Sequence, residues 1–339
     1  MARPISFLTR RLKRSRLRKS ELSRTQQSKA DLRYFEVQGH RGARGLRPEN
    51  TLAAFHLALS LGVDALELDT GLTADGVLVV CHNPEIPAKL CLHPDGTPVR
   101  RRPRLLIRKL TLEQVQAFDC GSRNPDPVQF PMQLLSPGEH IPTLAEVFEY
   151  QTRYFPKTQA RYTIECKINP LRPRDTFGPI FFAQKIVNLV QEYGLLERVT
   201  VQSFDWRVLL AVKQLNAKIQ TAALVRQRRG RPGTLLSRMG IASPFLAGLD
   251  FRRHQPDIAG LLRAAGFIDR YSPNFETLLP ESRDFIQPVH EIQQAGFPVV
   301  PWTVNKATIM NRLIDLGADG IITDFPDVLL EILAQRGLR

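Results

Sequence analysis

The residues in this chain best suited to chemistry begin with two carboxylates, Glu67 and Asp69, which stand two positions apart. In an extended strand, this spacing places both side chains on one face and Leu66 and Leu68 on the other. Two carboxylates at the end of a buried strand are unfavourable unless a cation lies between them. Because Mg²⁺ and Ca²⁺ prefer oxygen ligands, the pair predicts a site for one divalent ion. The alternative is a pair of acids on a surface loop.

A second pair with the same spacing is formed by Glu165 and Lys167, which flank Cys166. Glu165 is a candidate third metal ligand, and Lys167 can place a positive charge beside a substrate phosphate. Cys166 should then face the helix layer as part of the core. The alternative is that the glutamate and the lysine neutralise each other inside the protein.

Two histidines, His40 and His82, each follow a short apolar run that resembles a strand. Imidazole exchanges protons near neutral pH, so together they can act as general acid and general base. Either histidine alone could be structural, but three acids at equivalent strand ends favour a catalytic role. Arg41 and Arg44, close to His40 in the chain, can hold a phosphate.

The elements that must position these residues alternate from residue 34 onward. Strands are predicted at residues 35–39, 65–68, 77–81, 162–166, 199–202, 219–225, 299–304 and 320–323. Helices are predicted at residues 52–61, 144–153, 181–193, 206–215, 256–265, 283–295, 307–316 and 327–335. About eight strand–helix units predict an α/β protein with a closed (β/α)8 TIM barrel, whose chemistry lies at the carboxyl ends of its strands. A doubly wound open sheet is the alternative, but no G-x-G-x-x-G turn follows the first strand.

Residues 84–141 interrupt this alternation, and they are rich in Pro, Gly and Arg. The segment is too long for an ordinary barrel loop, so it is interpreted as an insertion after the second strand region. It either covers the mouth of the barrel or forms a small subdomain. A second irregular, basic stretch spans residues 226–245.

The net charge of +14 is concentrated in the first 33 residues, which hold eleven basic and two acidic residues. This gives a domain organisation of a basic flexible tail at 1–33 and a barrel domain at 34–339. The tail is interpreted as a disordered extension, as an anchor on an anionic membrane surface, or as a targeting or nucleic-acid arm. A nucleic-acid partner is not expected, because Phe7 is the tail's only aromatic residue and no binding module follows.

Composition excludes several classes of protein. No apolar stretch is long enough for a transmembrane helix, and four cysteines are too few for a disulfide-dense scaffold. There is no C-x-x-C pair for zinc, no Walker A loop and no Gly-x-Ser-x-Gly elbow. No Sec signal is visible, which predicts a cytoplasmic protein that the tail can bring to the membrane periphery. The oligomeric state is left open.

Taken in order, these motifs resemble the glycerophosphodiester phosphodiesterase family. The resemblance spans residues 36 to 330 and rests on a series of short motifs rather than on any one tetrapeptide. These are Gly39-His40-Arg41-Gly42, Pro48-Glu49-Asn50-Thr51, Glu67-Leu68-Asp69, His82-Asn83, Ile164-Glu165-Cys166-Lys167, Trp302-Thr303-Val304-Asn305 and Asp319-Gly320-Ile321-Ile322-Thr323-Asp324.

The resemblance implies a (β/α)8 barrel that hydrolyses a glycerophosphodiester to an alcohol and sn-glycerol 3-phosphate. It implies that His40 and His82 are the acid and base. It also implies roles for metal ligands at Glu67, Asp69 and Glu165, and for substrate-binding residues at Arg41, Lys167 and Trp302. Asn83 stands where the family often has Asp, which bears on the orientation of His82.

Two other functions remain open on the same sequence. One is a phospholipase D-like hydrolysis of lysophospholipids or sphingolipids, which would use the same barrel, metal and histidines. The basic tail and the arginine-rich residues 100–109 favour a membrane substrate of this kind. The other is a phosphate-binding module without catalysis, which is disfavoured because no expected metal or histidine position has been lost.

Overall fold

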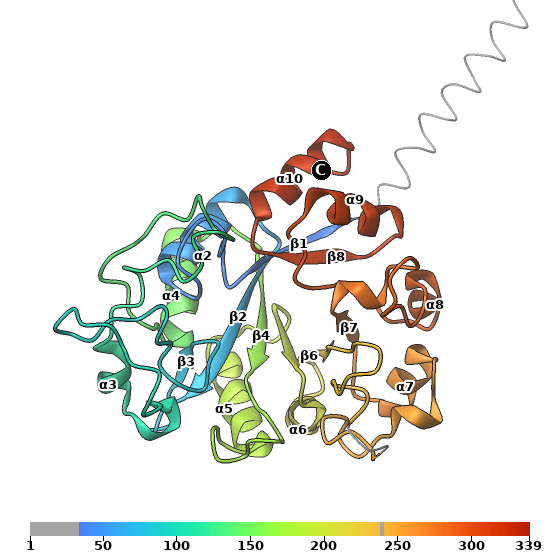
Figure 1. Cartoon of the computed structure of the whole chain (residues 1–339), viewed down its shortest axis with the longest axis horizontal. Helices are drawn as coiled ribbons and strands as arrows, with labels where there is room; N and C mark the ends of the chain where they lie inside the picture. The colour runs from blue at the N-terminus through green and yellow to red at the C-terminus, as the bar shows by residue number, and fades with distance from the viewer. Residues whose placement is uncertain (1–33, 238–240) are drawn as a thin grey trace, which may run out of the picture.

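A computed structural model describes residues 34–237 and 241–339 (Figure 1), so the predicted tail at 1–33 lies outside the described residues. A curled parallel sheet forms the centre, and helices surround it. Along this sheet the strand order is β7-β6-β5-β4-β2-β1-β8. Its members are β1 (Glu36–His40), β2 (Ala65–Leu72), β4 (Arg161–Cys166), β5 (Val199–Ser203), β6 (Gln220–Val225), β7 (Arg270–Pro273) and β8 (Gly320–Thr323). The predicted α/β barrel is confirmed.

The last gap in the barrel, between β7 and β8, is closed by an extended segment at residues 298–304. The amide of Val300 donates to Tyr271 on one side, and the amide of Ile322 donates to Pro301 on the other, at 2.9 and 3.0 Å. We expected a regular strand at 299–304, but the segment makes only isolated bridges to its neighbour. Proline is the reason, because Pro298 and Pro301 have no amide hydrogen to donate to a ladder.

The structure differs from the predicted strands at two other places. The run at 77–81 is not a barrel strand, because β3 (Leu78–Val80) pairs antiparallel with the end of β2. The chain therefore turns back toward the carboxyl end of the barrel before it reaches His82. Strand β7 was missed, because its sequence Arg-Tyr-Ser-Pro has no apolar alternation to reveal it.

The helices follow the strands with termini close to those predicted. They are α2 (Leu52–Leu61), α3 (Leu112–Gln116), α4 (Leu144–Tyr154), α5 (Pro179–Glu192), α6 (Trp206–Leu215), α7 (Ile258–Ala265), α8 (Val289–Gln294), α9 (Ala307–Asp315) and α10 (Pro326–Gln335). The predicted helix at 283–295 is shorter than expected, since α8 begins only after Pro288. Thr51 caps α2 by accepting the amide of Ala54, which fixes the turn between His40 and this helix.

The insertion at 84–141 has a hydrophobic core of its own, separate from the layer between strands and helices. That core contains Ile86, Val99, Ile107 and a disulfide between Cys91 and Cys120. Cys91 is therefore paired with another cysteine. In Figure 1 the segment lies beside β2, β3 and α4, at one edge of the barrel. It is a packed structure rather than a loose loop.

A buried carboxylate joins three strands at the amino-terminal end of the barrel. Glu36, the first residue of β1, forms ion pairs with Arg270 of β7 and with Arg161 of β4, the latter at 3.0 Å. Gln38 donates a hydrogen bond to the same carboxylate at 2.7 Å. Removing a partner from a buried pair leaves an uncompensated charge, which is strongly destabilising.

We therefore expect Glu36→Gln to lower the free energy of unfolding by about 3 kcal/mol, because Arg270 loses its only buried counter-charge among the described residues. Urea denaturation followed by circular dichroism measures the change. Glu192→Gln, at the exposed end of α5, is the matched control and should change stability by less than about 0.5 kcal/mol. Equal stability of the two variants would contradict the structural role of Glu36.

Candidate active site

The register of three strands brings the predicted acids together. Asp69 of β2 lies opposite Glu165 of β4, and Glu67 lies opposite His40 of β1. One carboxylate oxygen from each of Glu67, Asp69 and Glu165 lies within 4.8 Å of the others, and all three residues are buried. Because parallel strands end at the same edge, residues far apart in the sequence meet at one point of the barrel mouth.

Two basic side chains neutralise part of this charge. The Nζ of Lys167 lies 2.7 Å from Glu165 Oε1 and 3.0 Å from Asp69 Oδ1. The Nε of Arg41 lies 3.0 Å from Asp69 Oδ2, and its Nη1 lies 2.7 Å from Glu49 Oε1. Arg41 adopts a φ of 52°, a left-handed conformation that turns the chain back over the strand end.

The remaining electrostatic imbalance fits a divalent cation. Burial, together with the like charges of Asp69 and Glu165, raises the pKa of Glu67 well above its usual range. Burial likewise raises the pKa of Glu165 to about 7. Asp69 differs, since Lys167 and Arg41 overcome the effect of burial and hold its pKa well below its usual range. Buried carboxylates that repel each other form a donor set of oxygens, which suits Mg²⁺ or Ca²⁺.

His40 is held between two carboxylates. Its Nδ1 lies 2.6 Å from Asp324 Oδ1, and its Nε2 lies 3.9 Å from Glu67 Oε2. Burial lowers the pKa of His40 although Asp324 opposes the shift. The pKa of Asp324 is lowered to about 2, because His40 and Arg44 outweigh burial. Asn305 also donates to Asp324 at 2.6 Å, so this carboxylate is fixed in place.

His82 approaches the acids from the turn that follows β3. The amide of Cys81 donates to the carbonyl of Asp69 at 2.9 Å, which holds this turn against β2. The Nδ1 of His82 lies 2.8 Å from Asn83 Oδ1, so Asn83 has the orienting position next to the ring. Burial, and next the positive charge of Lys167, lower the pKa of His82 to about 3.

A cavity of about 150 Å³ joins these groups and is lined by His40, His82, Glu67 and Trp302, among others. The indole of Trp302 donates to the carbonyl of Ser272 at 2.8 Å and packs edge-on against Phe204. Its ring therefore forms a fixed wall of the cavity. All eight side chains predicted to form the site line this cavity or contact a residue that does.

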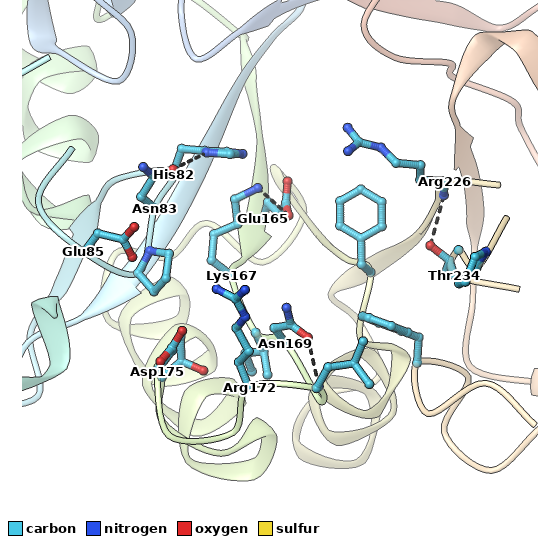
Figure 2. Close-up of a pocket in the computed structure, with 18 of the residues that line it drawn as sticks. His82, Asn83, Glu85, Glu165, Lys167, Asn169, Arg172, Asp175, Arg226 and Thr234 are labelled. Carbon is cyan, nitrogen blue, oxygen red and sulfur yellow. Dashed lines mark hydrogen bonds and ion pairs between the residues drawn. The ribbon is translucent and has the colours of Figure 1, made fainter. Parts of the chain in front are cut away.

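A larger groove of about 500 Å³ opens beside this cavity (Figure 2). In the figure, His82 and Arg226 face it from opposite walls, and Lys167 and Glu165 lie between them. In Figure 2 its lower wall comes from the segment after β4, which includes Asn169 and Arg172. The cavity and the groove together provide space on two sides of the histidines.

Sequence reasoning assigned no role to several residues of this site. Asp324 orients His40, Glu49 pairs with Arg41, and Gln202 donates to Glu67 at 2.7 Å. Asp324 directly follows β8 and Gln202 lies on β5, so the rule that barrel chemistry lies at strand ends could have found both. Glu49 precedes α2, and no periodicity marks it.

The fold and these side chains define a barrel enzyme with a buried acidic cluster and two histidines at its mouth. Comparison with known proteins gives its family. A model of the glycerophosphoryl diester phosphodiesterase family matches residues 40–328. The chain belongs to this family, and it is a phosphodiester hydrolase.

Individual relatives are similar to this chain over most of its length. A glycerophosphodiester phosphodiesterase of Caldanaerobacter subterraneus is 28% identical over 89% of this chain and 98% of its own length. A crystal structure described as a putative glycerophosphoryl diester phosphodiesterase, from Silicibacter pomeroyi, has 29% identity and a TM-score of 0.75, covering 90% of this chain and 96% of that one. The rat lysophospholipase D GDPD1 is 25% identical, over 87% of this chain and 84% of its own.

The acidic cluster predicts one divalent ion per chain. Calorimetric titration of EDTA-treated protein with Mg²⁺ or Ca²⁺ should show a single site, and Glu165→Gln should weaken binding at least about tenfold because a ligand oxygen is lost. Without metal, the same variant should unfold at a higher temperature than the wild type, because burial disfavours the charged form of Glu165 and Asp69 repels it, while Lys167 keeps its pair with Asp69.

Glu197→Gln is the matched control, since Glu197 is exposed and remote from the cluster. Its metal affinity should equal that of the wild type. Unchanged affinity in Glu165→Gln would contradict the assignment of this carboxylate as a ligand.

Proposed function

We propose that this enzyme carries out metal-dependent hydrolysis of glycerophosphodiesters to an alcohol and sn-glycerol 3-phosphate, with His40 and His82 as acid and base. The observation that carries the proposal is the carboxylate Asp324 behind His40, in a cavity shared with His82 and the acidic cluster. This arrangement combines a positioned proton acceptor with a place for a divalent ion. Membership of the family supports the choice of substrate.

The residues divide the work of this reaction. Glu67, Asp69 and Glu165 would hold a Mg²⁺ or Ca²⁺ ion, which would supply positive charge for the phosphate. Arg41 and Lys167 add to this potential, because they lie against the same carboxylates. A nucleophilic oxygen forms a bond to phosphorus, and the bond from phosphorus to the leaving alcohol breaks. One histidine accepts the proton of the nucleophile, and the other gives a proton to the leaving oxygen.

Asp324 sets the tautomer and the orientation of His40. As a proton acceptor at Nδ1, it directs Nε2 toward the cavity and stabilises the imidazolium once a proton is bound. Trp302 is a rigid apolar wall for the glycerol portion of the substrate. The groove of about 500 Å³ is one of the spaces beside His82 that can take the leaving alcohol.

That groove also favours a second candidate function, the phospholipase D-like hydrolysis of lysophospholipids. Ile168, Leu171, Phe204 and Phe245 line it, and these apolar side chains can contact an acyl chain. The rat relative named lysophospholipase D supports the same reading. A catalytically inactive phosphate-binding module has no comparable observation in its favour.

No helix in the described part of the chain is long and apolar enough to cross a membrane. We propose a cytoplasmic location with membrane contact through residues 1–33. The disulfide between Cys91 and Cys120 argues against the cytoplasmic location, because disulfides are rare in the cytosol.

A substrate comparison tests these functions. Purified protein with Mg²⁺ or Ca²⁺ should release glycerol 3-phosphate from glycerophosphocholine, and EDTA should abolish the release. Release of choline from lysophosphatidylcholine alone would favour the second function. Binding of both compounds with no turnover would leave a binding module and would contradict the proposal.

Asp324→Asn should lower kcat by about a hundredfold or more with little change in KM, because an amide can hold the wrong tautomer of His40. Steady-state kinetics with glycerophosphocholine measures both constants, and circular dichroism checks the fold. Asp315→Asn, on the surface of α9, is the matched control and should behave as the wild type. A kcat close to that of the wild type in Asp324→Asn would show that His40 does not depend on this carboxylate.

A further inference from the structure

A second large cavity, of about 540 Å³, adjoins the active site on the side of the insertion. Arg41, Arg44 and His82 line it where it meets the catalytic cavity. Its outer wall consists mainly of insertion residues. We call it the cationic vestibule, after the basic side chains of that outer wall: Lys89, Arg100, Arg101, Arg102, Arg104 and Arg172.

The vestibule has a large excess of positive charge. In total, eight Lys and Arg side chains and three carboxylates line it. Two of the carboxylates are already paired, since Glu49 binds Arg41 and Arg44, and Glu85 lies 2.6 Å from Arg104. The third carboxylate is the exposed Asp126. Within residues 34–237 and 241–339, no ion pair is formed by the five remaining cations: Lys89, Arg100, Arg101, Arg102 and Arg172.

These cations are mounted on packed structure. Val99, directly before the first of the arginines, is buried in the core of the insertion. Arg104, after them, is fixed by Glu85 and by Asp175 at 2.8 Å. The amide of Ile86 donates to Leu105 at 2.9 Å, which joins the two walls of the vestibule. The backbone around the arginines is therefore anchored, and the exposed side chains of Lys89, Arg100, Arg101, Arg102 and Arg172 border the cavity.

We propose that the vestibule binds a second anionic group, a phosphate on the leaving alcohol, so that the enzyme selects glycerophosphodiesters whose alcohol is itself charged. The inference rests on the proposed function and deepens it. The reacting phosphodiester carries one negative charge and meets the acidic cluster with Arg41 and Lys167. The unpaired cations lie beyond that centre, and like charges around a cavity attract an anion strongly. A concave site that reaches His82 suits a compact anion better than a flat bilayer.

Two soluble substrates separate the contribution of the vestibule from that of the catalytic centre. One is glycerophosphoglycerol, whose leaving glycerol is neutral, and the other is the same diester with a phosphate on the leaving glycerol. Loss of the diester signal in phosphorus NMR measures both reactions. The vestibule variant is Arg100→Gln with Arg101→Gln, and the control variant is Lys157→Gln with Lys218→Gln. The control residues are exposed and lie in loops at the other end of the barrel, where β4 and β6 begin.

The wild type and the control should favour the phosphorylated diester at least about tenfold in kcat/KM at low salt, and this preference should shrink near 1 M salt. The vestibule variant should keep less than about a third of the preference, mainly through a higher KM, and should hydrolyse glycerophosphoglycerol within about twofold of the wild-type rate. The unchanged rate on the neutral substrate shows that the variant is folded.

Equal kcat/KM of the wild type for the two diesters overturns the proposal, as does an equal loss in both variants. Cosedimentation with vesicles of phosphatidylglycerol and phosphatidylcholine tests the membrane alternative. If the vestibule variant loses vesicle binding but keeps its substrate preference, the cations serve a membrane and the proposal is wrong.

Failure of the proposed function gives a different result, since neither diester would then be hydrolysed. In that case calorimetry with the same two diesters decides the inference. Tighter binding of the phosphorylated diester by the wild type, lost in the vestibule variant, supports it, and equal binding overturns it.

Discussion

Repulsion among three buried carboxylates is the constraint on which the rest of the site depends. Glu67, Asp69 and Glu165 are held within 4.8 Å by the register of β2 and β4. Such a cluster is unfavourable in a buried environment without counter-charges. Lys167 and Arg41 supply part of the compensation, and the raised pKa values of Glu67 and Glu165 show that it is incomplete. The proposed divalent ion would meet the remainder, and the same charge would serve a phosphodiester.

The barrel separates this chemically unfavourable end from a stabilising one. At the amino-terminal end of the strands, Glu36 joins β1, β4 and β7 through Arg161 and Arg270. At the carboxyl end, the polar groups converge on a cavity, and side chains such as Asp324 and Asn305 hold the histidine in place. Burial therefore stabilises the fold at one end and shifts the proton affinities of the reacting groups at the other.

Specificity has a separate origin, in the segments that surround the strand ends. The groove of Figure 2 has apolar residues after β4, β5 and β6 among its polar ones, whereas the outer wall of the vestibule carries cations that come mainly from the insertion. Both cavities include His82, so the proposed reaction would give the leaving alcohol two chemically different places to lie. The insertion can supply a fixed wall because it has its own core and a disulfide.

Many of the strands and most of the site residues could be predicted from the sequence alone. Apolar runs such as residues 162–166 revealed strands, and the spacing of two residues between acids placed their side chains on one face of a strand. The residues of the acidic cluster and both histidines were predicted because period and residue type are local properties. Strand β7 was not predicted, since its short sequence carries no periodic signal. A strand was predicted at 299–304, but its prolines reduce it to an extended segment with isolated bridges.

Tertiary structure alone decided which distant residues meet. The partner of His40 is Asp324, 284 positions away, and no local pattern joins them. The antiparallel return of β3, which brings His82 to Asp69, depends on pairing with the end of β2. The cationic vestibule arises in the same way, because the insertion packs against the barrel mouth and adds its arginines to those of the first loop. Sequence spacing specifies the face of an element, but only packing specifies its neighbours.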